Sequence, residues 1–352
     1  MLTLALAGGT SATLGRAITT AVLSGLYTKM QWKTVILTRN PKKPNWLQAV
    51  DPHSLMTDLR GVDYFDTDSL SSVLEDVDTV ISVTSATDGT QPRIQLNLLD
   101  AANRAGCRRF VPSHWGMGPK AYESGTFGLL EGGVWQECLK RRAHLESARF
   151  NNGLFLNYLG YGILSAEMKA KAAQPTLEEL QAGGGYAQGA DYALEGVAFE
   201  EDMPDGEGTF FISLKNAIAE IPVKEDGSWP RISMTSVRDI GRFVAASLDL
   251  PKWEQNMNIM GDTLTAGELI ELSERVTGRR FDVQLLKRRD LQEQLDALPD
   301  GSLQRLALEF KESYCRDEEG FGWSMPTVNE LCPRVKPMST EEYLQRWWTQ
   351  RA

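Results

Sequence analysis

The stretch from Leu2 to Leu23, LTLALAGGTSATLGRAITTAVL, constrains the fold more than any other part of the sequence. It opens with small and apolar residues at 2–7, which suit a strand buried on both faces of a parallel sheet. A glycine-containing turn follows at 8–15, and apolar residues then recur on one side of a predicted helix. A strand, a tight turn and a helix in this order are typical of a βαβ nucleotide-binding unit, in which the helix N-terminus favours a pyrophosphate.

The turn departs at one position from the glycine-rich pattern of dinucleotide-binding proteins. From Gly9 to Gly15 it reads G-x-x-A-x-x-G, so Ala12 places a methyl group where the backbone should approach the phosphates. Two interpretations remain open, namely a phosphate cradle and a turn that merely connects a strand to a helix. On the first interpretation, the cofactor-binding residues are Gly9, Thr10, Ser11, Ala12, Thr13, Leu14 and Gly15.

A second buried strand is predicted at 34–38 (TVILT), and it ends in the basic sequence Arg39-Asn-Pro-Lys-Lys43. In a dinucleotide-binding fold this strand ends beside the adenosine ribose, where an acidic residue binds the 2′-hydroxyl and an arginine accommodates a 2′-phosphate. Arg39 and Lys43 therefore favour NADP over NAD. The alternative is a solvated basic loop with no ligand.

Further strands and helices alternate along the first half of the chain. Short apolar runs predict strands at 62–65, 79–85 and 109–113, and helical patterns are found at 69–76 and 91–105. This alternation predicts an α/β fold built on a Rossmann-type, doubly wound parallel sheet.

The rest of the chain is predicted to form a smaller, mostly C-terminal α/β region on the substrate side. We expect a Rossmann domain over 1–160, to which 215–260 returns, and a substrate-binding region over 161–214 and 261–352. The Gly-rich and acidic stretch near 175–208 is either a lid that closes on a substrate or a surface excursion with no role.

Composition narrows the classes of function. Over 352 residues the net charge is −10, which argues against a nucleic acid partner because phosphate binding needs a cationic face. The chain lacks both a long apolar run and the features of a signal peptide, so no membrane contact is predicted and a cytoplasmic protein is expected. The four cysteines and three histidines form no C-x-x-C or H-E-x-x-H motif, so no metal site is predicted.

Three later segments carry a more specific pattern, and they are Cys107–Gly116 (CRRFVPSHWG), Met234–Trp253 (MTSVRDIGRFVAASLDLPKW) and Asn258–Leu269 (NIMGDTLTAGEL). They resemble segments of the NmrA-like and isoflavone-reductase-like family of atypical short-chain dehydrogenases, and they occur in that family's order. The resemblance implies NADP(H) as the cofactor, held by the first turn, by Arg39 and by the ends of the fourth and fifth strands. The candidate residues at these two strand ends are Thr84, Ser85 and Ser113.

The usual proton donor of short-chain dehydrogenases is missing. None of the nine tyrosines is followed four residues later by a lysine, so a Tyr-x-x-x-Lys mechanism is not expected. The family that the chain resembles carries instead a lysine on the helix after the fifth strand, and a helix is predicted here at 134–150. Ungapped counting places Arg142 at that position, and a two-residue slip would place Lys140 there.

The choice between these two residues matters chemically. A desolvated lysine exchanges its proton near neutral pH, whereas an arginine only polarises a carbonyl. Lys140 is therefore the candidate catalytic residue, and the alternative is that residues 140–142 form an exposed basic face.

His114 is the second candidate catalytic residue. It replaces the family's usual glutamate just beyond the fifth strand, where ligands bind in open α/β sheets. An unperturbed histidine pKa of about 6.5 suits an acid or base, and the alternative is a histidine satisfied by backbone groups of the loop. Aromatic residues that could line a substrate pocket, although aromatic residues more often belong to a core, are Trp115, Trp135, Tyr158 and Tyr161.

Together these features predict an NADPH-dependent reductase of a small aromatic or polyketide-like metabolite. It would act on a carbonyl, an imine or an activated double bond, with His114 or Lys140 supplying the proton. One alternative is a dinucleotide-sensing regulator of the NmrA type, which binds NADP and a protein partner without turnover. Another is the same fold recruited for a non-redox dehydration or cyclisation.

Overall fold

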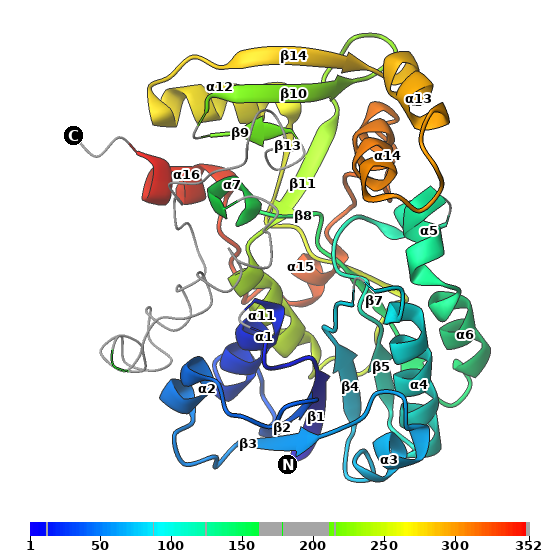
Figure 1. Ribbon diagram of the computed structural model, residues 1–352. Coiled ribbons are helices and arrows are strands. Elements are labelled where there is room, and N and C mark those ends of the chain that lie inside the picture. The colour runs from blue at the N-terminus through cyan, green and yellow to red at the C-terminus, as the bar shows by residue number, and fades with distance from the viewer. Residues whose placement is uncertain are drawn as a thin grey trace.

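A computed structural model of the chain describes residues 1–11, 13–86, 88–123, 125–161, 178, 211–214 and 216–349. Its largest sheet has six parallel strands in the order β3-β2-β1-β4-β5-β6 (Figure 1). The strands are β1 (Leu2–Ala7), β2 (Trp32–Thr38), β3 (Thr57–Gly61), β4 (Thr79–Ser82), β5 (Arg109–Val111) and β6 (Glu146–Ser147). The strand order reverses between β1 and β4, which confirms the predicted Rossmann-type sheet.

Helices cover both faces of this sheet (Figure 1). Alternate residues of β1 face opposite cores, so Leu4 and Leu6 pack with one set of helices and Ala5 and Ala7 with the other. This explains why the strand is apolar throughout rather than alternating. The covering helices are α1 (Leu14–Leu23), α2 (Asn45–Val50) and α11 (Val237–Ser247) on one side, and α3 (Thr67–Ser72), α4 (Gln91–Arg104) and α6 (Val134–Arg141) on the other.

The third strand lies earlier than the sequence predicts. The predicted strand at 62–65 is wrong, because β3 comprises Thr57–Gly61 and residues 62–65 follow it. Val62 and Tyr64 are nevertheless buried, since they pack into the core beneath the edge of the sheet. β3 is an edge strand with only one fully buried residue, so it has no apolar run to mark it in the sequence.

The predicted helix at 134–150 is also wrong in length. α6 ends at Arg141, and the chain then enters β6 and β7 (Arg149–Asn151). Arg109, fully buried in β5, bonds the Glu146 carboxylate of β6 and stacks over Trp253, which holds this short strand at the sheet edge. A tertiary ion pair therefore overrides the local helical pattern.

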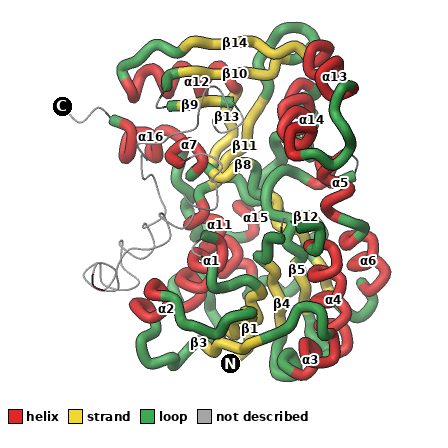
Figure 2. Tube along the Cα trace, viewed as in Figure 1, coloured by secondary structure: helices red, strands yellow, loops and turns green. Residues whose placement is uncertain are grey.

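The second half of the chain forms a separate layer of small sheets and helices (Figure 2). The mixed sheet β14-β10-β9 and the sheet β13-β11-β8 pack with helices around a second core. The strands are β8 (Leu154–Phe155), β9 (Ile212–Ser213), β10 (Ile218–Val223), β11 (Arg231–Thr235), β13 (Asp262–Thr265) and β14 (Asp282–Lys287), while β12 (Asn256–Asn258) pairs with β7. The helices are α7 (Tyr158–Tyr161), α12 (Ala266–Thr277), α13 (Arg288–Asp296), α14 (Leu303–Cys315) and α16 (Thr340–Trp348), while α15 (Thr327–Leu331) packs in the core of the large sheet.

Several described elements connect the two layers, among them α11, α15 and the pair of β7 with β12. α11 belongs to the later half of the sequence but packs along α1, whereas β10, from the same predicted returning segment 215–260, lies in the small mixed sheet. A 3₁₀ turn (Pro119–Tyr122) and α5 (Gly125–Glu131) leave the end of β5 and reach α14. The predicted lid at 175–208 lies outside the described residues, apart from Glu178. In the described part of the chain, no helix has the length and apolar character to cross a membrane.

Candidate functional site

A cavity of about 450 Å³ lies at the carboxyl ends of the parallel strands, beside the point where the strand order reverses. Its floor comes from the strand ends, with Val83–Ala86 after β4 and Ser113–Trp115 after β5. The N-terminus of α1 supplies Thr13 and Leu14. The remaining described lining comes from α4, α5, α7, α11 and α14 and from the loops beside them, and includes Gln91, Gln95, Tyr122, Phe127, Leu130, Glu131, Phe155, Tyr158, Val237 and Leu306.

The glycine turn is packed so closely that no side chain would fit at Gly9 or Gly15. A Cβ on Gly15 would lie 2.6 Å from the Gly9 carbonyl oxygen and 2.7 Å from Ser11 Oγ. Ser11 Oγ accepts the Gly15 N–H at 2.9 Å and so caps the start of α1. The turn is therefore tightly packed, and of its described residues Thr13 and Leu14 line the cavity. Ala12 lies outside the described residues, and Thr10 is half-buried in the turn.

A single glutamine ties the two strand ends together beneath the cavity. Gln95 Nε2 donates to Ser82 Oγ at 2.9 Å and to Thr84 Oγ1 at 2.6 Å, and its Oε1 accepts the Ser113 N–H at 2.9 Å. Ser113 Oγ in turn donates to the Thr84 carbonyl at 2.8 Å. The predicted cofactor residues Thr84, Ser85 and Ser113 thus come together, and the first and last of them are held in place by Gln95.

The two basic residues predicted to bind the cofactor after β2, Arg39 and Lys43, lie in different surroundings. Arg39 is exposed directly beyond the strand, and its charge acts on the Tyr64 hydroxyl, which accepts the Gly8 N–H of the turn at 3.1 Å. Lys43 is held elsewhere, because its Nζ donates to the Asp51 carbonyl and to Ser54 Oγ at 2.9 Å. The structure therefore leaves Arg39 beside the turn and ties Lys43 to the loop before β3.

His114 lies in the wall of the cavity and is only 5% exposed. Its ring stacks on Tyr122 with centroids 5.0 Å apart and an angle of 17° between the planes. Burial, with the charge of Arg149 adding to it, lowers the pKa of His114 to about 3. His114 is therefore neutral at physiological pH, with Nε2 3.6 Å from Glu131 Oε1.

Glu131 ends α5 and separates this cavity from a second one of about 630 Å³. Its Oε2 accepts the Gly133 N–H at 2.8 Å, and its Oε1 accepts the Trp135 N–H, so the carboxylate caps the start of α6. Tyr122 and Glu131 line both cavities, whereas Trp135 and Arg149 line only the second.

The predicted lysine does not reach either cavity. Lys140 lies on the outer side of α6 with 69% of its side chain exposed, and it pairs with Glu137. Arg142, just after the helix, is exposed as well. Residues 140–142 therefore follow the alternative of a solvated basic face. Among its described lining residues the first cavity contains no lysine.

The aromatic candidates separate into three groups. Trp115 and Tyr158 line the first cavity, and Trp115 Nε1 donates to the Ser82 carbonyl at 2.8 Å. Trp135 is buried beneath the Arg149 guanidinium, 4.3 Å from the ring centroid, on the side of the second cavity. The Tyr161 side chain lies outside the described part of the structure.

Several lining residues are not predicted from the sequence, and they include Gln95, Tyr122, Phe127, Glu131 and Leu306. Gln95 had a detectable signal, because with Gln91 it places two amides one turn apart on an otherwise amphipathic helix. The others come from segments with no motif, and Leu306 reaches the cavity from a helix far along the chain.

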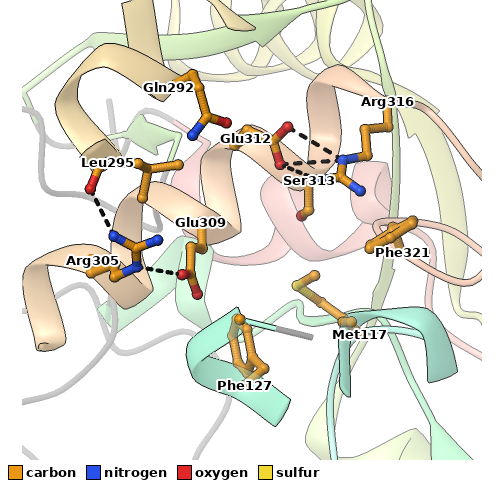
Figure 3. Close-up of a pocket in the computed structure, with 12 residues that line it drawn as sticks. Met117, Phe127, Gln292, Leu295, Arg305, Glu309, Glu312, Ser313, Arg316 and Phe321 are labelled. Atoms are coloured by element: carbon orange, nitrogen blue, oxygen red, sulfur yellow. Dashed lines mark hydrogen bonds and ion pairs between the residues drawn. The ribbon is translucent and has the colours of Figure 1, made fainter. Parts of the chain in front are cut away.

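Ion pairs fix the helix that carries Leu306. In a small cavity of about 170 Å³ between α5 and α14, Arg305 bonds Glu309 and the Leu295 carbonyl, and Arg316 bonds Glu312 (Figure 3). Glu309 also accepts the Thr126 N–H of α5 at 2.7 Å. The Glu309–Thr126 bond joins α14 to α5, the Arg305–Leu295 bond joins α14 to α13, and the two ion pairs stabilise α14 itself.

Comparison with known proteins agrees with this geometry. The model of the NmrA-like family matches residues 3–130. A relative named oxidoreductase BOA1, from Botryotinia fuckeliana (strain B05.10), is 28% identical over 287 residues, which cover 80% of this chain and 78% of the relative.

Solved structures of reductases share the fold. Structures of pinoresinol-lariciresinol and phenylcoumaran benzylic ether reductases align with a TM-score of 0.66 at 18% identity, covering 98% of each chain. AtPrR2 with NADP⁺ and (+)pinoresinol aligns with a TM-score of 0.63 at 19% identity, again covering 98% of each chain. The fold therefore extends beyond the matched family segment to the C-terminal layer.

Proposed function

We propose that the chain is an NADPH-dependent oxidoreductase acting on a small aromatic or polyketide-like molecule, and the match of the NmrA-like family model to residues 3–130 supports this. The observation that carries the proposal is the single cavity that joins the glycine turn to an apolar wall. Thr13 and Leu14 of the turn lie at one side, and Phe127, Phe155 and Leu306 lie among its other described walls. The named oxidoreductase relative and the NADP⁺-bound neighbour support it.

The described residues of the turn fit a dinucleotide. The close packing at Gly15 excludes a side chain there, Ser11 Oγ takes up the Gly15 N–H, and the other N–H groups and the helix dipole at the start of α1 favour phosphates. Ser85 and Ser113 line the cavity at the strand ends, which supports their contact with the nicotinamide, and the exposed position of Arg39 beyond β2 supports its contact with a 2′-phosphate. When bound, NADPH supplies a hydride to the substrate.

The chain's own residues then orient and enclose the substrate. Phe155, Tyr158 and Leu306 offer apolar surface that excludes water from the reacting atoms. Trp115 is held by its bond to the Ser82 carbonyl, so its indole forms a fixed part of the floor. His114, neutral and buried, offers a hydrogen bond to a polar group of the substrate.

The cofactor assignment is tested through Arg39. Replacing Arg39 by Ala should weaken NADPH binding by about 10- to 100-fold, because one charge-assisted phosphate contact contributes about 1.5–3 kcal/mol. NADH binding should change little, and both affinities are measured by titration of nicotinamide fluorescence.

The matched control is Lys43→Ala, since Lys43 is held by the Asp51 carbonyl and Ser54. It should leave the preference for NADPH over NADH unchanged. Equal losses of NADPH and NADH binding in Arg39→Ala would refute the 2′-phosphate assignment. Failure of the unaltered protein to bind either nucleotide would refute the oxidoreductase proposal itself.

A second candidate function rests on the exposed position of Lys140. The described lining of the cavity contains no lysine. This observation favours a second candidate function, a dinucleotide-sensing regulator that binds NADPH without turnover. NADPH oxidation followed by absorbance, with quinones and phenolic ketones as trial substrates, distinguishes the two. Saturable NADPH binding without turnover of any trial substrate would favour the regulator.

A further inference from the structure

We infer that Glu131 holds His114 in the tautomer that carries its proton on Nε2, which leaves Nδ1 to accept a hydrogen bond from a hydroxyl group of the ligand. Glu131 is thus a positioning residue, and it acts on the ligand only through His114. The inference rests on the proposed function for the part that places a small molecule in the cavity of about 450 Å³.

The Glu131 carboxylate is suited to this role because its own position is fixed. Both oxygens accept backbone N–H groups at the start of α6, from Gly133 and from Trp135. A helix N-terminus stabilises a negative charge, and an ionised carboxylate can only accept hydrogen bonds. Its side chain is 7% exposed, so water does not replace the imidazole as its neighbour.

Two neighbours, Tyr122 and Glu131, fix the position of the His114 ring. Stacking on Tyr122, at 5.0 Å and 17°, sets the plane of the ring. Nε2 lies 3.6 Å from Glu131 Oε1, which is longer than a hydrogen bond but close enough for the carboxylate to favour a proton on this nitrogen. A neutral imidazole has one N–H and one lone pair, so a proton on Nε2 makes Nδ1 the acceptor.

Nδ1 is the atom whose missing hydrogen-bond partner indicates a ligand. It is buried and has no hydrogen-bond partner among the described residues, although His114 belongs to the wall of the cavity. A buried acceptor without a donor is unfavourable, and a hydroxyl group delivered by a ligand would relieve this. A phenol or an alcohol meets this requirement, whereas a ligand that presents only ether or carbonyl oxygens does not.

The tautomer is directly measurable by nitrogen NMR on protein labelled with ¹⁵N-histidine. The chain has three histidines, and His53 and His144 are exposed, so His114→Gln identifies the buried signal by its loss. We expect His114 to show a protonated Nε2 and an unprotonated Nδ1 in the unaltered protein. A proton on Nδ1 instead, or protons on both nitrogens at neutral pH, would overturn the inference.

Variants of the carboxylate separate positioning from mere packing. In Glu131→Gln the negative charge is gone, so the Nδ1–H tautomer should gain at least an equal share. Glu123→Gln is the matched control, because Glu123 lines only the second cavity, and it should retain the original tautomer. An unchanged tautomer in Glu131→Gln contradicts the role of Glu131. If that variant does not fold, Glu131→Asp replaces it, and the unaltered protein still decides the tautomer.

The ligand is tested with two aromatic probes in the presence of NADP⁺. 1-Naphthol should shift the Nδ1 resonance, because its hydroxyl group donates to that nitrogen, and 1-methoxynaphthalene should not. Equal shifts, or no shift with 1-naphthol, would overturn the hydroxyl assignment. The nucleotide titration described above is independent of these spectra, so failure of the oxidoreductase proposal is recognised separately from failure of this inference.

Discussion

At the scale of single residues, the environment of His114 makes the ring neutral rather than a ready acid. Only 5% of the residue is exposed, and burial together with the charge of Arg149 lowers its pKa to about 3. The Glu131 carboxylate favours the protonated form, but the loss of water around the ring outweighs it. The phenol of Tyr122 stacks on the same ring, and burial raises its pKa, so Tyr122 remains uncharged as well.

This depressed pKa predicts acid sensitivity of the fold. The unfolded chain binds a proton at His114 near pH 6.5 and the folded chain does not until about pH 3, so the stabilising contribution is complete above about pH 6.5 and falls as pH decreases. His114→Gln removes this effect. We expect the free energy of unfolding of the unaltered protein to fall by about 2 kcal/mol more than that of His114→Gln between about pH 7 and pH 5.

Urea denaturation at the two pH values measures the difference. His144→Gln is the control, because His144 is exposed and its removal should leave the pH dependence unchanged. Parallel curves for the unaltered protein and His114→Gln would show that the ring is protonated within the folded protein.

At the scale of elements, the site depends on the close contact between α1 and α11. A Cβ on Gly241 of α11 would overlap the backbone carbonyl of Ala17 in α1, so the two helices touch through their main chains. α1 begins at the glycine turn, and α11 supplies Val237 to the cavity wall. Any separation of the helices therefore moves both Leu14 and Val237 in the cavity wall.

Gly241→Ala should therefore destabilise the protein by about 2–3 kcal/mol, since overpacking against backbone cannot be relieved by a rotamer change. NADPH affinity should fall with it. Gly61→Ala is the matched control, because the new methyl group would meet nothing closer than Pro41 at 3.8 Å. Thermal unfolding and nucleotide titration measure the two effects, and an unaffected Gly241→Ala variant would contradict the close packing of α1 and α11.

Elements also differ in how far their sequences identify them. β1, β2 and β4 are apolar runs buried on both faces, so local pattern alone predicts them. The local pattern does not predict β3, because its sequence TDLRG lies at the edge of the sheet. It also gives the wrong end for the helix at 134–150, because the ion pair with Arg109 holds Glu146 in a strand. The strand-end residues Thr84 and Ser113 were predictable from the fold, but Glu131 and Leu306 were not, because only tertiary packing brings them there.

At the scale of the whole molecule, a helix from the C-terminal layer contributes to the wall of the cavity. Leu306 of α14 lines the wall of the cavity, whereas the floor of the cavity comes from the first 115 residues of the chain. On the proposed function, the Rossmann sheet provides the nucleotide side, and the later layer shapes the space left for a substrate. This division predicts that the two binding events respond separately to substitution.

Leu306→Trp should fill part of the substrate space and leave the glycine turn untouched. Binding of 1-naphthol in the presence of NADP⁺ should weaken about tenfold, equivalent to about 1.4 kcal/mol, with little change in nucleotide affinity. Equilibrium dialysis measures the first and fluorescence titration the second. Leu285→Trp, at a half-exposed position on β14, is the control, and a similar loss in both variants would indicate a general disturbance of the fold.

The four free cysteines, at positions 107, 138, 315 and 332, are all buried, and this gives the molecule an internal reporter of its own opening. Cys107 and Cys138 lie in the core beneath one face of the large sheet, Cys332 belongs to the core on the other face, and Cys315 ends α14. A thiol reagent can modify them only when the surrounding layer separates. The order in which the four sulfur atoms react would therefore reveal which layer opens first, without any added label.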